Sequence, residues 1–177
     1  MKTHVALIRG INVGKAKRVA MADLRALLET LGYGEPRTLL NSGNLVFDAG
    51  RAAARQVAAR VESGMAAKLK LSARVTVLTA AEFGTVVAEN PLGSVADDPS
   101  RLLVAFLSEP KHRGRLQPLA RQAWQPEALG LGSRAAYLWC PAGSIGSPLA
   151  EAVGRVLGEA TTTRNWATVT KIRAMLG

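Results

Sequence analysis

Residues 37–48 read RTLLNSGNLVFD, with the turn-forming sequence Asn41-Ser42-Gly43 between two largely apolar runs. Asn and Gly both tolerate the positive φ angles that tight turns require. The stretch therefore predicts a β-hairpin whose strands cover residues 37–40 and 44–48. These two strands are the centre from which the rest of the first half can be built.

Further elements are predicted on both sides of this hairpin from apolar spacing. A buried strand is expected over residues 3–8, a helix over 21–31, a second helix over 51–69 and a strand over 73–78. The resulting order, β-α-β-β-α-β, is that of the split-βαβ, ferredoxin-like arrangement. We therefore expect an α+β protein that begins with a ferredoxin-like subdomain over residues 1–80.

The second half, residues 81–177, predicts a similar order of elements. The expected elements are a helix over 80–89, a strand over 101–107, a helix over 113–122, strands over 127–129 and 134–140, a helix from Pro148 to Leu157 capped by Ser147, and a last helix over 163–176. This is a βαββα half that ends in a C-terminal helix in place of a final strand. We expect the two subdomains to form one compact unit.

Composition places the chain among globular proteins. Its 177 residues are 48% hydrophobic and 20% charged, which excludes disordered, collagen-like and coiled-coil classes. The net charge is +10, and residues 1–80 carry +8 of it, with 13 Lys or Arg and 5 Asp or Glu. A basic surface attracts nucleic acid, anionic lipid or phosphorylated metabolites, although the abundance of Arg and Ala also fits a plain compositional bias.

Several classes of protein are disfavoured by what the sequence lacks. Cys140 is the single cysteine, so neither an internal disulfide nor a thiolate zinc cage can form, and a reducing cytoplasm is the expected location. No run of 18 apolar residues is present, which argues against a membrane span. His4 and His112 lack metal-binding spacing, and we expect neither a metal nor a cofactor.

The predicted topology brings the loop over residues 9–18 next to the hairpin turn at 41–44. Strand 44–48 lies between its two neighbours and runs antiparallel to both, so its start lies beside the end of strand 3–8. Glycine N–H groups, asparagine amides, basic side chains and a helix N-terminus then converge, which favours anion binding. The candidate ligand-binding residues are Arg9, Gly10, Asn12, Gly14, Lys15, Asn41, Ser42, Gly43 and Asn44.

This anion-site hypothesis has a plainer alternative. The segment matches neither the Walker A spacing nor Gly-x-Gly-x-x-Gly. The glycines can simply shape a turn, the asparagines can close the hairpin, and the basic side chains can be a solvated face.

A second candidate lies near the C-terminus. Arg164 and Asn165 follow three threonines and precede Trp166, so a cation, an amide and an aromatic ring are expected near a helix N-terminus. The alternative is a capped helix whose Trp166 enters the core. The glycine-rich loop at 143–147 can likewise bind a phosphate or act as a simple connection.

Several blocks of sequence carry a family resemblance. They are Arg9-Gly10-Ile11-Asn12-Val13-Gly14 with Lys15, then Met21-Ala22-Asp23-Leu24-Arg25 and Leu31-Gly32-Tyr33, then Asn41-Ser42-Gly43-Asn44-Leu45-Val46-Phe47, and finally Thr163-Arg164-Asn165-Trp166 with Thr168-Val169. Together they resemble the bacterial domain of unknown function 1697 family. The resemblance implies a stand-alone α+β protein with ferredoxin-like halves and no established activity. Ala167 and Ser147-Pro148 depart from the asparagine and lysine that the resemblance leads us to expect.

Three functions are compatible with these observations, and whether the protein is an enzyme stays open. The first is binding of a small phosphate-bearing or nucleic-acid ligand where the two loops meet. The second is an acylphosphatase-like phosphohydrolase, in which Arg9 or Arg18 and Asn41 or Asn44 would act. The third is a protein-interaction module without a small ligand. An RNA-recognition motif is disfavoured, because Phe47 is the one aromatic residue in the two predicted central strands.

Overall fold

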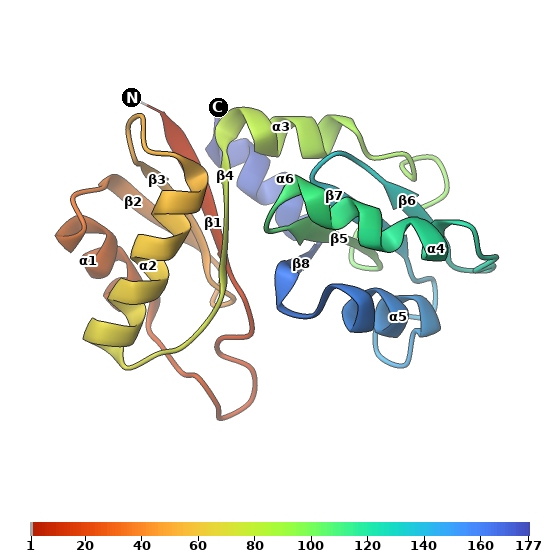
Figure 1. The fold of residues 1–177 in the computed structure, drawn as a ribbon, viewed down its shortest axis with the longest axis horizontal. Coiled ribbons are helices and arrows are strands. Elements are labelled where there is room, and N and C mark those ends of the chain that lie inside the picture. The colour runs from red at the N-terminus through yellow and green to blue at the C-terminus, as the bar shows by residue number, and fades with distance from the viewer. Residues whose placement is uncertain (1) are drawn as a thin grey trace. The chain divides into compact units, whose positions relative to one another are not determined.

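A computed structural model describes residues 2–177 and divides into two compact units (Figure 1). Unit 1 contains the residues up to Phe83 together with Ala174–Gly177, and unit 2 contains Gly84–Arg173. The predicted subdomain boundary lay at residue 80, and the helix α3, Ala80–Ala88, crosses the observed one. No helix among the described residues has the length and apolar character needed to cross a membrane.

Unit 1 has the element order expected from its sequence. The elements are β1 (Thr3–Ile8), α1 (Met21–Thr30), β2 (Gly34–Leu39), β3 (Asn44–Asp48), α2 (Ala54–Leu69) and β4 (Val75–Thr79). The four strands form one antiparallel sheet in the order β2-β3-β1-β4. Thus β3 does lie between β1 and β2, and Leu7 of β1 pairs with Asn44 at the start of β3.

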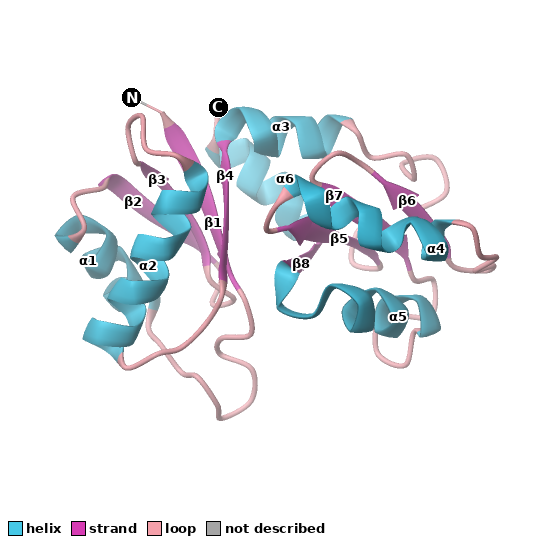
Figure 2. Ribbon diagram, viewed as in Figure 1, coloured by secondary structure: helices cyan, strands magenta, loops and turns pink. Residues whose placement is uncertain are grey.

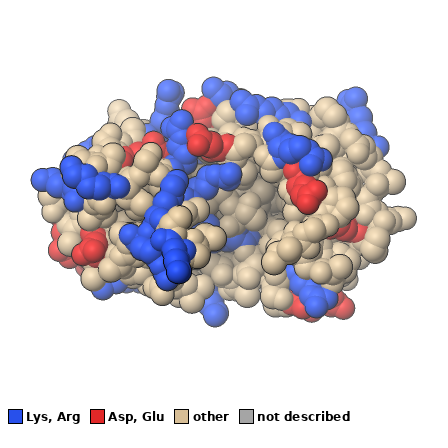
Figure 3. Space-filling model, turned by 90° about the horizontal axis from the view of Figure 1, so that it is seen from below, with Lys and Arg blue, Asp and Glu red and all other residues tan. Residues whose placement is uncertain are grey.

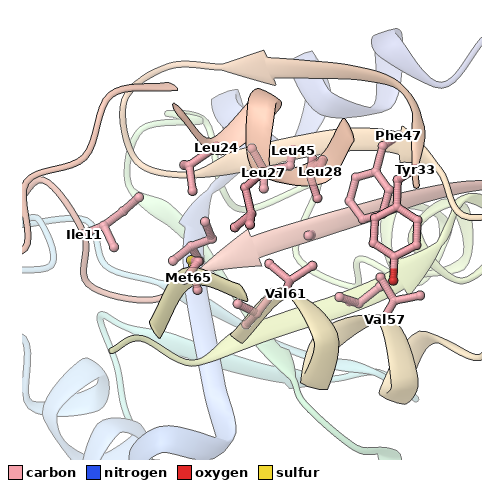
Figure 4. Packing of buried hydrophobic residues seen from close by; sticks show 14 of the residues in the cluster. Ile11, Leu24, Leu27, Leu28, Tyr33, Leu45, Phe47, Val57, Val61 and Met65 are labelled. Atoms are coloured by element: carbon pink, nitrogen blue, oxygen red, sulfur yellow. The ribbon is translucent and has the colours of Figure 1, made fainter. Parts of the chain in front are cut away.

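The core of unit 1 explains why these segments form these elements. Leu24, Leu27 and Leu28 recur at helical spacing in α1, and all three are buried. Figure 4 shows them directed towards side chains of β3 and α2, with Met65 among the latter. Burial of one such side chain stabilises a fold by about 1.5–3 kcal/mol, so the apolar stripes fix the helices on one face of the sheet.

Unit 2 contains a second four-stranded antiparallel sheet, in the order β6-β7-β5-β8 (Figure 2). Its elements are β5 (Leu102–Leu107), a 3-10 helix (Pro110–Leu116), α4 (Gln117–Ala120), β6 (Ala128–Leu131), β7 (Ala135–Trp139), α5 (Pro148–Leu157), a 3-10 turn (Gly158–Ala160), β8 (Thr161–Asn165) and α6 (Trp166–Met175). The α+β class with two similar halves is confirmed.

The prediction that unit 2 lacks a final strand is wrong. Residues Thr161–Asn165 form β8, which pairs with β5 along its length, and the last helix begins at Trp166 instead of residue 163. Thr161 to Thr163 are β-branched and favour extended backbone. The strand was missed because its side chains are polar and show no apolar alternation.

The helix predicted over residues 113–122 is also corrected. The segment forms a 3-10 helix ending at Leu116 and a short α-helix, Gln117–Ala120. Gly114 weakens a helix interior, and Pro118 has no N–H with which to continue the hydrogen-bond ladder.

Candidate functional site

The loop between β1 and α1 forms a small projection of unit 1 (Figure 1). Val13 and Ala16 form an antiparallel bridge, and the Asn12 N–H donates to the Lys17 carbonyl at 3.0 Å. Gly14 and Lys15 lie at the tip, where Gly14 has a φ of 60° that residues with a Cβ rarely adopt. We call residues 9–18 the basic loop.

Asn12 connects the basic loop to the β2–β3 turn. Its side-chain nitrogen donates to the Val19 carbonyl at 2.9 Å and to the Asn41 carbonyl at 2.7 Å. Its side-chain oxygen accepts from the Val19 N–H at 2.8 Å. Since one amide spans both segments, the convergence of the basic loop and the turn at 41–44 is present in the structure.

The β2–β3 turn is closed by two residues that are buried. Asn44 is 1% exposed and donates to the Leu39 carbonyl at 2.8 Å and to the Ser42 hydroxyl at 2.9 Å. Gly43 has a φ of 83°, and its carbonyl accepts from the Ile8 N–H at 2.9 Å. A Cβ at Gly43 would lie 2.8 Å from Cδ1 of Ile11, so close packing as well as backbone angle requires glycine here.

The basic side chains of this region are accessible. Lys15, Lys17 and Arg18 are exposed, and none of the three forms a salt bridge with any residue that the structure describes. Figure 3 looks from below, onto the side to which the basic loop extends, and shows several Lys and Arg side chains gathered there. Arg9 is partly buried, and its N–H donates to the Arg74 carbonyl at 2.9 Å.

The start of α1 adds a further partial positive charge. Its N-cap, Ala20, makes no side-chain hydrogen bond to the helix. Asn12 holds Val19, which is the residue directly before that N-cap. The basic loop is therefore attached to a helix N-terminus without a side-chain cap, where backbone N–H groups favour anions.

Arg164 and Asn165, the other two candidates, belong to unit 2. The Asn165 side-chain oxygen accepts from the Thr168 N–H at 2.9 Å, so Asn165 caps α6. Arg164 lies on β8 opposite Val104 and donates to the Thr163 carbonyl at 3.0 Å. Burial lowers the pKa of Arg164 to about 10, because the charged form loses solvation.

The glycine-rich loop of unit 2 leads into a helix whose N-terminus is already occupied. The Ser147 hydroxyl accepts from the Ala150 N–H at 3.0 Å and donates to Glu127, while Glu127 also accepts from the Leu149 N–H at 3.1 Å. Sequence reasoning missed Glu127, which lies directly before β6. A carboxylate already placed at this helix start disfavours binding of a second anion.

Two apolar side chains on the converging segments were also missed. Val13 is 69% exposed and Leu40 is 51% exposed, although large hydrophobic residues are usually buried. They directly adjoin Asn12 and Asn41, the two residues that join the segments. The sequence signal was the position of both residues directly beside turn residues. Leu40 was predicted to end a strand, but β2 ends at Leu39.

The described residues contain no group of three or more His, Cys, Asp or Glu side chains that could hold a metal ion. Burial raises the pKa of the Cys140 thiol. Because the thiolate is the reactive form of cysteine, this fully buried thiol is a poor nucleophile. The chemistry available at the converging segments is therefore that of ammonium, guanidinium and backbone N–H groups.

Fold and site together describe an α+β protein with two four-stranded antiparallel sheets and a braced basic loop. Residues 1–137 match the model of a family described as "Protein of unknown function (DUF1697)", and the chain belongs to this family. No curated protein matches the chain.

One solved structure that the chain resembles is described as that of "conserved bacterial protein SP0830 from Streptococcus pneumoniae". The two are 23% identical, the alignment covers 99% of each chain, and the TM-score is 0.81. At this identity the similarity establishes the fold alone.

Proposed function

We propose that unit 1 binds the phosphate group of a phosphate-bearing small molecule or of a nucleic acid where the basic loop meets the turn at 41–44. The observation that carries the proposal is the exposure of Lys15, Lys17 and Arg18 without a carboxylate partner in the described chain. Cations that no internal anion neutralises raise the local concentration of phosphate and favour its binding.

The bracing of the basic loop supports the same proposal. A loop held in one conformation before binding loses less conformational entropy when it binds. The three hydrogen bonds of the Asn12 amide and the packing of Gly43 against Ile11 hold this loop. In this proposal Asn12, Gly43 and Asn44 position the loop, whereas Lys15, Lys17 and Arg18 contact the phosphate.

The acylphosphatase-like alternative has less support. It needs an asparagine amide that can orient a water molecule beside a phosphoryl group. The two side-chain N–H groups of Asn44 are spent on Leu39 and Ser42, and those of Asn12 are spent on Val19 and Asn41. Asn41 is exposed, and its carbonyl accepts a hydrogen bond from the Asn12 amide.

The test is a comparison of two variants with the same loss of charge. Lys15→Gln with Arg18→Gln removes two cations from the basic loop. Lys2→Gln with Arg51→Gln removes two from the end of the sheet where β1 begins and β3 ends. Binding of inorganic phosphate, adenosine monophosphate and a short oligothymidylate is measured by calorimetry at low and moderate salt.

At least one of these three probes is expected to bind the wild type. The loop variant is expected to bind it at least tenfold more weakly, since charge-assisted hydrogen bonds contribute about 1.5–3 kcal/mol each. The control variant is expected to retain most of the affinity. If both variants lose the same affinity, the binding comes from the overall positive charge and not from the basic loop, which contradicts the proposal. If none of the three probes binds the wild type, the proposal is also refuted.

A further inference from the structure

We infer that the ligand of the basic loop is a single-stranded nucleic acid, whose bases contact Val13 and Leu40 while its phosphates contact the neighbouring cations. This inference rests on the proposed function and narrows it from any phosphate-bearing molecule to one class. It depends on the exposed side chains of Val13 and Leu40, which inorganic phosphate or a sugar phosphate would not contact.

The first argument is the placement of exposed apolar surface. Among residues 2–177, the large hydrophobic side chains that are exposed are Val13, Leu40, Val95 and Ile145. Two of these four flank the hydrogen bond between Asn12 and Asn41. Within the proposed site, these two side chains offer apolar surface to a ligand that has an apolar face of its own. A nucleobase attached to a phosphate has such a face.

The second argument is the backbone of Leu40. Its φ is 58°, in the left-handed region that a branched residue such as leucine rarely adopts. A glycine or asparagine would fit this turn position with less strain, and leucine gains little burial there because it is 51% exposed. Residues with strained backbone angles are concentrated at functional sites.

The third argument is the number and spread of the charges. Lys15, Lys17 and Arg18 lie at separate positions along an exposed projection, and their side chains are exposed. A chain of successive phosphates can place one phosphate against each of these cations. A strand with successive phosphates and unstacked bases satisfies the cations and the apolar groups together.

A single strand is favoured over a duplex for the same reason. In a duplex the faces of the bases are stacked on one another, so only sugars, phosphates and base edges are accessible. Contact between Val13 or Leu40 and a base face requires an unstacked base.

The experiment uses the full chain and a fluorescein-labelled oligothymidylate, with anisotropy titrations at several salt concentrations. Three contacting cations predict that log K falls with log[salt] with a slope of about −2, at roughly 0.7 per phosphate contact on a single strand. Lys15→Gln is expected to reduce the magnitude of that slope by about 0.7.

The apolar contacts are tested by polar substitutions of similar shape. Leu40→Asn keeps the size of the side chain and tolerates the positive φ, and Val13→Thr replaces one methyl group with a hydroxyl. We expect Leu40→Asn to weaken binding about fivefold and Val13→Thr about twofold, with the salt slope unchanged. Val95→Thr, which changes a similarly exposed valine of unit 2, is the matched control and is expected to have no effect.

The outcomes separate this inference from the proposed function. If the oligonucleotide binds with the expected slope but Leu40→Asn and Val13→Thr leave affinity unchanged, the inference is wrong and phosphate binding stands. Adenosine monophosphate or a duplex binding as tightly as the single strand also overturns the inference. Phosphatidylserine vesicles that bind with the same dependence on Leu40 would overturn it in favour of a lipid surface. If no phosphate-bearing probe binds, both fail.

Discussion

Replacement of Gly43 by alanine tests whether the turn at 41–44 is built as described. The new Cβ would lie 2.8 Å from Cδ1 of Ile11 and 2.9 Å from Cβ of Ile8. Neither isoleucine can move away easily, because Ile8 is fully buried and Ile11 is 2% exposed. The backbone would also hold alanine at a φ of 83°.

The cost has two parts. A left-handed backbone conformation destabilises a residue with a Cβ by about 1–2 kcal/mol. Overpacking of a core destabilises the fold by about 1–3 kcal/mol. Gly43→Ala is therefore expected to lower the free energy of unfolding by about 2–5 kcal/mol, measured by urea denaturation.

Gly14→Ala is the matched control for the backbone part. Gly14 has a φ of 60°, and a Cβ there would meet no atom within 4 Å. This variant is expected to lose only the backbone part, about 1–2 kcal/mol. If Gly43→Ala is no more destabilising than Gly14→Ala, the close packing between the turn and the basic loop is refuted.

Two further predictions concern the hydrogen bonds of the site and the buried thiol. Asn12→Ala removes three hydrogen bonds that join the basic loop to Val19 and Asn41. Each contributes roughly 0.5–1.5 kcal/mol net, so the free energy of unfolding, measured by urea denaturation, is expected to fall by about 2 kcal/mol. A loss below about 0.5 kcal/mol would contradict the bracing role. Burial raises the pKa of the Cys140 thiol, so the stability that its protonated form contributes is complete below the ordinary thiol pKa and is lost as pH rises through the raised value. Between about pH 7 and about pH 10, the Cys140→Ala variant is therefore expected to lose less free energy of unfolding than the wild type. An identical pH dependence of urea unfolding in the two proteins would contradict this.

The sequence predicted most of unit 1 because its local signals agree with one another. Gly43 in the predicted turn has the positive φ expected of a turn glycine. The leucines of α1 are buried, as their helical spacing indicates. Antiparallel topology then places the end of β1 beside the start of β3, which is a geometric consequence of strand order.

The details of the site could not be predicted in the same way. The Asn12 amide forms hydrogen bonds within the protein, whereas the Lys15 side chain is exposed. This difference depends on the direction of each side chain, which residue spacing does not predict in a loop. In unit 2, tertiary pairing with β5 makes a strand of Thr161–Asn165, although their pattern carries no apolar alternation. Glu127 contacts the start of α5 from its position directly before β6, a contact that only the fold creates.

The most direct test of the central claim is a map of phosphate binding on the isotope-labelled protein. Backbone amide shifts are followed by NMR while inorganic phosphate, and then an unlabelled oligothymidylate, is added. Binding at the basic loop predicts that the largest shifts occur at Gly10, Gly14, Lys15 and Gly43. Largest shifts in the loop at 143–147 or at the start of α5, with residues 9–18 and 41–44 unchanged, would contradict it.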